Sequence, residues 1–378
     1  MSELITPRTC ANMRLQLLAT VSALSLLAIT SQAQAEDTDR PTVWLELGGQ
    51  LARMDGGEQQ FAPPFILATP RPAPEKISPL SVGHPPRYSF DAEGKLTFVP
   101  KGTNWVFSAA VRFGRSSAHK HLHQQSYPTH YLFPSVYPGA GASYQYALPF
   151  SDVEHKSSES HAVLDFRAGR DVGMGMFGHD SSSVFSLGVR FAQFGSQSNT
   201  AFKSQPDFHP TYKYFGGAKH INAIHYHNYL ATAAATRSFH GVGPSLSWNA
   251  SAPFAGNTDN GEIAFDWGVN GAVLFGRQKA SVHHQTTAHY KTRGQNYFYP
   301  PITVYRHTPP DQSRSRSVVV PNVGGFAGLS FNYPNAKISV GYRADFFLGA
   351  MDGGIDTRKT YNRNFFGPFA TISVGLGG

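Results

Sequence analysis

The sequence predicts an all-β protein: a transmembrane, antiparallel, up-and-down β-barrel of about ten strands, with short periplasmic turns and long extracellular loops. Three observations predict this fold. Apolar and polar residues alternate along many segments, which is the pattern of strands with two different faces. No segment after residue 35 is apolar enough to span a bilayer as a helix. Charged residues are only 15% of the chain and glycines number 37, which favours strands and turns over long helices.

The N-terminus has the pattern of an export signal. Two arginines precede an apolar run at 15–30, and an A-x-A cleavage pattern follows at 33–35. We therefore expect a signal peptide over 1–35 and a mature barrel over 36–378. A transmembrane anchor is the alternative, but the run is short for a hydrocarbon core of about 30 Å. The single cysteine, Cys10, lies in the segment expected to be removed, so the mature chain would have no disulfide.

Ten segments show the alternation, and an even number is typical of bacterial single-chain barrels. Proline cannot donate a hydrogen bond to the ladder, so Pro244 and Pro321 leave the boundaries of two segments open. A soluble β-sandwich or a periplasmic barrel with a dry core is the alternative, but the polar positions are charged too often for a dry core. The predicted strands lie at 43–51, 88–98, 105–113, 162–169, 185–191, 240–248, 262–275, 319–331, 338–348 and 368–376.

The connections between these segments alternate in length. Short periplasmic turns and longer extracellular loops are typical of outer-membrane barrels. The short connections lie at 100–103, 171–182, 249–260 and 333–336, and the long ones, which we expect to be extracellular loops, lie at 54–87, 116–160, 195–236 and 276–313.

Charged residues occupy many polar positions of the predicted strands. A charge that faces lipid costs about 2–4 kcal/mol at the bilayer midplane, so these side chains are expected to face the lumen. Two roles stay open for them: a constriction that sorts ions by sign, or a paired network that braces a narrow barrel. The predicted lumen-lining set is Glu46, Asp91, Glu93, Lys95, Arg112, Asp165, Arg167, Arg190, Glu262, Asp266, Arg343 and Asp345.

Histidines supply the candidate metal ligands. His119, His121 and His123 alternate, so an extended chain would place all three on one face. Imidazole suits Zn, Cu or Ni, but few carboxylates lie nearby, which favours the alternative of solvated loop residues. The sequence contains no Walker loop, dinucleotide fingerprint, H-E-x-x-H or G-x-S-x-G motif. We therefore expect no cofactor and no enzymatic activity.

Several segments resemble the Legionella-type major outer-membrane protein family. The resemblance implies an outer-membrane barrel with a pore-forming role, and it implies no catalytic residues. It is carried by the predicted strands and short turns, in LTFVPKGTNWVFSAAVRFGRSS (96–117), HAVLDFRAGRDVGMGMFG (161–178), SLGVRFAQF (186–194), GGFAGLSFNYPNAKISVGYRADFFLGAMDGGIDTRK (324–359) and GPFATISVGLGG (367–378).

Together these observations predict a porin-like passive pore for small solutes or ions in the cell outer membrane. The alternative is a closed structural or surface-binding barrel, whose long loops, rich in histidine and aromatic residues, contact a ligand or host surface. The expected partners are outer-membrane lipid, lipopolysaccharide and small solutes or ions. The net charge of +8 is not gathered into a basic stripe, so we expect no nucleic-acid partner. The oligomeric state stays open.

Overall fold

The computed structural model describes residues 42–55, 87–125, 150–172, 182–205, 209–215, 218–257, 261–294, 303–308, 310–355 and 359–376. The predicted signal peptide lies outside them. The described residues form twelve strands: β1 (Thr42–Asp55), β2 (Arg87–Val99), β3 (Trp105–Gln125), β4 (Phe150–Asp171), β5 (Ser182–Gln205), β6 (His209–Phe215), β7 (Ala218–Asn257), β8 (Gly261–Gly294), β9 (Thr303–His307), β10 (Gln312–Tyr333), β11 (Ala336–Asp352) and β12 (Thr360–Leu376). No helix in this described part is long and apolar enough to cross a membrane.

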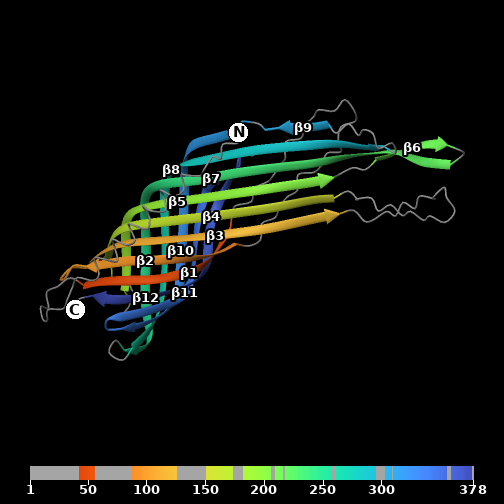
Figure 1. Ribbon diagram of the computed structural model, residues 1–378. Helices are drawn as coiled ribbons and strands as arrows, with labels where there is room; N and C mark the ends of the chain where they lie inside the picture. The colour runs from red at the N-terminus through yellow and green to blue at the C-terminus, as the bar shows by residue number, and fades with distance from the viewer. Residues whose placement is uncertain are drawn as a thin grey trace. The chain divides into compact units, whose positions relative to one another are not determined.

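Ten of these strands close into one antiparallel barrel (Figure 1). Around the barrel the order is β1-β2-β3-β4-β5-β7-β8-β10-β11-β12, and the pairing of β12 with β1 completes the ring. The short strands β6 and β9 pair only with the far ends of β7 and β8. Each predicted segment lies within a different one of the ten barrel strands. The predicted ten-stranded antiparallel barrel is therefore confirmed.

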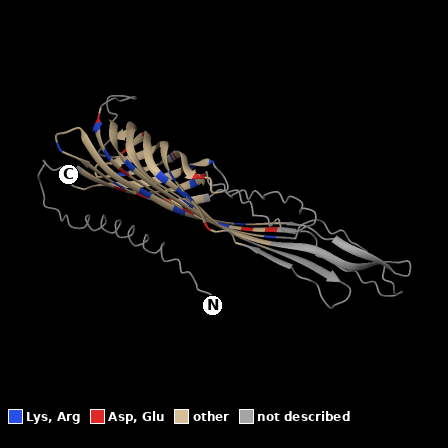
Figure 2. Cartoon of the chain, turned by 90° about the horizontal axis from the view of Figure 1, so that it is seen from above, with Lys and Arg blue, Asp and Glu red and all other residues tan. Residues whose placement is uncertain are grey.

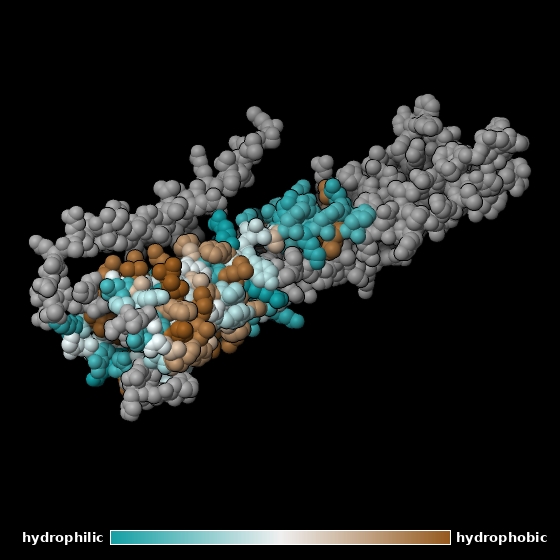
Figure 3. All heavy atoms as spheres, turned by 90° about the horizontal axis from the view of Figure 1, so that it is seen from below, coloured by the Kyte–Doolittle hydropathy of each residue, from teal (hydrophilic) through white to brown (hydrophobic). Residues whose placement is uncertain are grey.

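The outer face of the barrel is apolar, whereas the outer surface of a soluble protein carries mainly polar side chains. On β8, Phe265, Val269, Val273 and Phe275 are 39–57% exposed, whereas Leu274 between them is fully buried. Period-two alternation causes this, because successive side chains of a strand point to opposite faces. Figure 3 shows hydrophobic side chains gathered over the barrel and hydrophilic ones over the extension beyond it. Exposed apolar side chains in a closed ring are stable only against lipid. We call this band of outward apolar side chains the apolar belt.

The strands are longer than the sequence pattern predicts. The expected loops at 195–236 and 276–313 are largely strand, because β5, β7 and β8 continue far past the apolar belt. Beyond the belt most outward residues are polar, such as Asn199, Thr236 and Lys279, so the regular alternation of apolar with polar residues stops while the ladder continues. The expected loop at 116–160 is shorter, because β3 extends to Gln125 and β4 begins at Phe150. Most of the expected loop at 54–87 lies outside the described residues.

The prediction left the strand boundaries near Pro244 and Pro321 open. Pro244 and Pro321 mark no strand end, and both are exposed on the outer face of continuous strands. The β7–β8 ladder omits Gly243 and Pro244, while the β5–β7 ladder continues through them, so the missing donor interrupts one side only. The last strand begins at Thr360 rather than at residue 368. This longer β12 brings additional side chains into the lumen.

Candidate functional site

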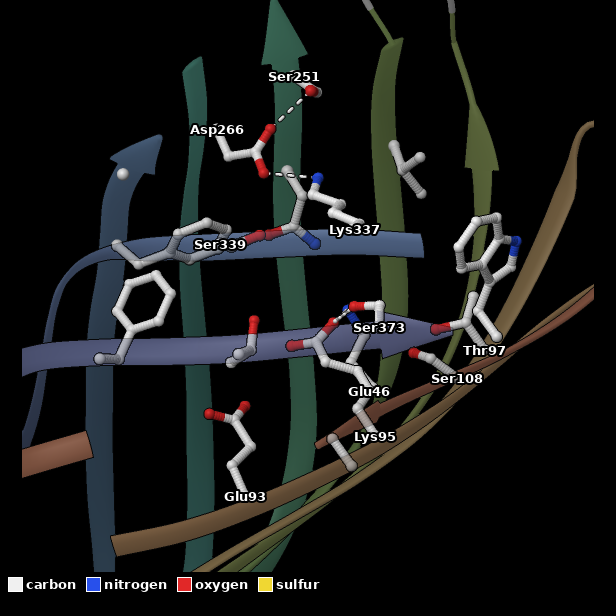
Figure 4. A pocket seen from close by; sticks show the side chains of 18 of the residues that line it. Glu46, Glu93, Lys95, Thr97, Ser108, Ser251, Asp266, Lys337, Ser339 and Ser373 are labelled. Atoms are coloured by element: carbon white, nitrogen blue, oxygen red, sulfur yellow. Dashed lines mark hydrogen bonds and ion pairs between the residues drawn. The ribbon is translucent and has the colours of Figure 1, made fainter. Parts of the chain in front are cut away.

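The inward side chains enclose a cavity of about 660 Å³ in the half of the barrel nearest the short turns (Figure 4). Because every second residue of each strand points inward, ten strands supply one continuous polar lining. The lining extends from Trp44 and Asn332, near strand ends, up to Arg190 and Asp345 in the middle of the barrel. The lumen cavity therefore reaches the periplasmic end of the strands.

All but one of the twelve predicted lumen residues line this cavity. The exception is Asp91, which is fully buried nearer the extracellular side. Its carboxylate accepts a hydrogen bond from Ser89 Oγ at 2.5 Å and lies 2.8 Å from His161 Nε2. Gly114 allows this approach, because a Cβ there would lie 2.0 Å from the Asp91 Oδ1 atom. The residues that line the cavity are Glu46, Glu93, Lys95, Arg112, Asp165, Arg167, Arg190, Glu262, Asp266, Arg343 and Asp345.

Ion pairs cross the lumen at the upper end of the cavity. Arg112 on β3 lies 2.7 Å from Asp345 on β11, four strands away around the ring. Arg343 on β11 pairs with Glu93 on β2, and its guanidinium lies 5.0 Å from the ring centroid of Phe369. Sequence alternation placed these residues inside the barrel, but only the closed ring brings them together.

A second group of polar contacts surrounds Asp165. Arg190 donates from Nε and Nη2 to its two carboxylate oxygens, at 2.7 and 3.0 Å, and Arg167 Nη2 lies 3.0 Å away. Arg190 Nη1 also donates to Asn270 at 2.8 Å and to Asn322. The Arg190 guanidinium is fixed by Asp165 on one side and by the two asparagines on the other. These contacts connect β4 and β5 with β8 and β10 across the barrel.

The lower cavity holds ion pairs that are more exposed. Lys95 Nζ lies 3.6 Å from Glu46, and Lys337 Nζ lies 2.5 Å from Asp266 (Figure 4). Lys337 is absent from the predicted lumen set, because the predicted strand begins one residue later, at 338. The sequence could have indicated Lys337, because it lies an even number of residues from the inward Arg343 on β11 and therefore faces the same way.

The charges of the cavity balance. Figure 2 shows residues of both signs interspersed along the barrel strands. The numbers of cations and carboxylates are equal, so their charges largely cancel and leave little net electric field in the lumen. Among the described lining residues there are six cations, Lys95, Arg112, Arg167, Arg190, Lys337 and Arg343, and six carboxylates, Glu46, Glu93, Asp165, Glu262, Asp266 and Asp345.

A buried polar layer lies above the cavity. Arg363 on β12 pairs with Glu159 on β4, and each side chain is 1% exposed. His161 on β4 packs against Phe365, with ring centroids 4.2 Å apart. These residues are absent from the predicted lumen set, because 116–160 was expected to be a loop and the neighbouring strands were expected to begin only at 162 and 368.

Four phenylalanines pack against one another inside the barrel at this level. Phe194 on β5 lies 5.6 Å from Phe239, 4.8 Å from Phe347 and 5.6 Å from Phe365, measured between ring centroids. All four rings are fully buried. In the ring order, β5 and β12 are five strands apart in either direction, so the contact of Phe194 with Phe365 spans the full diameter. We call these four residues the aromatic seal.

A sequence signal for the seal exists. Phe346-Phe347 and Phe365-Phe366 are adjacent pairs, and in a strand one member of each must face inward. Phe346 is 40% exposed while Phe347 is fully buried. The inner face was expected to be polar, so the inward rings are absent from the predicted lumen set.

The candidate metal ligands lie on the outer face of β3, above the belt. His119 lies 3.2 Å from Glu154, and His121 and His123 both approach Asp152. Among the described residues, no group of three or more His, Cys, Asp or Glu side chains is arranged to hold a metal. Glu154 also bonds Lys156 at 2.7 Å, and this hydrogen bond lowers the pKa of the carboxyl below its usual value. The arrangement is a network of exposed ion pairs.

Comparison with known proteins gives distant likenesses. No protein-family model and no curated protein sequence matches the chain. The transport unit of the autotransporter AIDA-I from Escherichia coli is 8% identical, with 95% of this chain and 98% of that chain covered and a TM-score of 0.25. A deletion mutant of the TodX monoaromatic hydrocarbon channel is 9% identical, with 90% and 91% covered and a TM-score of 0.22. OmpT of Vibrio cholerae is 10% identical, with 91% and 100% covered and a TM-score of 0.16.

Scores this low carry no conclusion about the chain, whose fold follows from its own strand pairing. A closed ring satisfies the backbone hydrogen bonds within the sheet, and its outer face is an apolar belt. Even-numbered antiparallel barrels with these two properties are the membrane-spanning structures of the bacterial outer membrane. The chain is an outer-membrane β-barrel.

Proposed function

We propose that this barrel is closed across its lumen at rest and is a non-enzymatic anchor that presents a polar β-sheet outside the membrane for surface binding. The observation that carries the proposal is the contact of Phe194 with Phe365, whose ring centroids lie 5.6 Å apart although their strands face each other across the barrel. Two rings in contact leave no water-filled passage between them. The buried Arg363–Glu159 pair fills the adjacent level.

The strands beyond the belt support the second half of the proposal. A spanning strand needs about 9–11 residues. β5 has 24 residues, β7 has 40 and β8 has 34, so each continues far outside the membrane. Outward residues there, such as Asn199 and Thr236, are exposed and polar. A rigid sheet costs little conformational entropy when it binds a ligand, which suits a surface-binding role.

A passive pore for small ions or solutes is the second candidate. The charged lumen cavity favours it, and the Legionella-type resemblance of the sequence implies it. Under this second candidate the chain would be a member of that family. A pore would require the aromatic seal to move aside, because the cavity ends beneath it.

Conductance in planar lipid bilayers tests the proposal. We expect wild-type protein to insert without measurable steps. The opened variant, Phe194→Ala with Phe365→Ala, should conduct small ions, because it removes two rings that meet in the lumen. The matched control is Phe191→Ala with Phe366→Ala, which removes two rings from the outer face of the same strands and should stay silent.

Steady conductance of the wild type would overturn the closed-barrel proposal in favour of the pore. Insertion is checked independently by heat-modifiable migration in detergent gels, so silence caused by misfolding is recognised. An opened variant that is folded but silent would show that the aromatic seal is not what closes the lumen.

A further inference from the structure

A group of basic residues lies at the extracellular edge of the apolar belt. On β8 the outward residues from Phe265 to Phe275 are apolar or glycine. Ten residue steps at about 3.4 Å and a strand tilt of about 40° correspond to a height of about 26 Å, which matches the apolar band of an outer-membrane barrel. Arg277 is the next outward residue and Lys279 follows it, so both lie where lipid headgroups begin.

An arginine, a lysine and a histidine lie on neighbouring outward positions here. Arg277 lies directly opposite His240 on β7, and Lys279 lies one outward position further along β8. All three side chains are exposed. Neighbouring like charges on one face of a sheet repel each other, and an anion between them removes that cost. We call His240, Arg277 and Lys279 the rim site.

The surroundings of the rim site add donors and no competing carboxylate. Ser315 and Ser317 on β10 lie opposite Lys279 and Arg277. Arg277 Nε donates to Ser315 Oγ at 2.7 Å, which orients the guanidinium. Within the described strands β7, β8 and β10 no carboxylate faces outward, and Asp311, which precedes β10, contacts His283 further from the belt. The Arg277 and Lys279 head groups therefore remain available to a ligand.

We propose that the rim site binds the phosphate group of a glycolipid in the outer leaflet. A planar guanidinium and an ammonium are the side chains that bind phosphate oxygens, and the apolar belt beside them accepts the acyl chains. The acyl chains of such a lipid would lie against Val273 and Phe275, which are 42% and 57% exposed. This site is on the outer face, so it is independent of whether the lumen is open or closed.

Native mass spectrometry in a neutral detergent tests the proposal. The probes are lipid A carrying two phosphates, the same lipid after dephosphorylation, and inorganic phosphate. We expect the wild type to prefer the phosphorylated lipid. Arg277→Gln and Lys279→Gln should each weaken its binding about fivefold, and the double variant about 30-fold, which is the range for headgroup contacts of single cations. Dephosphorylated lipid should bind wild type and double variant alike.

The matched control is Lys203→Gln, which removes an exposed lysine of β5 far above the belt and should leave lipid binding unchanged. Equal binding of phosphorylated lipid to wild type and folded double variant would overturn the proposal. A loss as large in Lys203→Gln would also overturn it, because attraction would then be set by net charge. Full displacement of the lipid by millimolar inorganic phosphate would assign the site to a soluble phosphate instead of a lipid.

Discussion

The buried pair of Arg363 and Glu159 permits a quantitative test of the packed lumen. Each side chain is 1% exposed, and the Arg363 guanidinium lies 5.7 Å from the ring centroid of Phe365 in the aromatic seal. Glu159→Gln leaves a buried guanidinium without its counter-charge. Removing one partner of a buried ion pair costs about 3–5 kcal/mol. We expect this loss in the free energy of unfolding, measured by guanidinium titration of the barrel in phospholipid vesicles.

A double-mutant cycle separates the pair from its surroundings. The cycle uses Arg363→Met, Glu159→Gln and the two combined, and the combined variant should be less destabilised than Glu159→Gln alone, because no buried charge remains unpaired. Lys95→Met is the control, since its pair with Glu46 is 3.6 Å long and the lysine is 37% exposed, and it should cost about 0–1 kcal/mol. A cost of Glu159→Gln no greater than that of the control would refute the reasoning. Strict additivity in the cycle would refute it as well.

Two further predictions concern the belt and the lumen charges. Val269→Arg should cost about 2–4 kcal/mol of unfolding free energy in vesicles, because Val269 faces lipid near the middle of the belt, whereas Thr232→Arg, exposed above the belt, should cost little. Equal tolerance at both positions would mean that the assigned membrane position is wrong. In the opened variant, Asp345→Asn should shift the reversal potential across a salt gradient toward anions, because it frees an arginine partner, and Arg343→Ala should shift it toward cations. Both shifts should weaken at 1 M salt, where the screening length is about 3 Å, and unchanged selectivity would mean that these residues only brace the wall.

Much of the barrel could be predicted from the sequence because the relevant signal is local. On β8, Phe265 and Asp266 are neighbours with opposite surroundings, and period two is enough to assign one to lipid and the other to the lumen. The same local signal failed beyond the belt. There the outer faces of β5, β7 and β8 are mostly polar, and large apolar residues such as Phe202 and Leu230 occur only in places. The ladder therefore continues without a regular alternation in hydropathy.

The aromatic seal could not be predicted in the same way. Phe194 and Phe365 are far apart in the sequence, and each could be recognised as inward only by strand parity. That their rings meet depends on the number of strands in the ring, on the pairing of β12 with β1 and on the stagger of every ladder between them.

The sequence by itself therefore determined the strands of the belt, their two faces and the barrel class, because adjacent residues of a strand must point in opposite directions. Only the tertiary structure decided which inward side chains meet. Arg112 pairs with Asp345, Arg363 pairs with Glu159, and Phe194 contacts Phe365, because the ring brings distant strands face to face. Contacts across the lumen are a property of that three-dimensional arrangement, since they leave no periodic trace along any single strand.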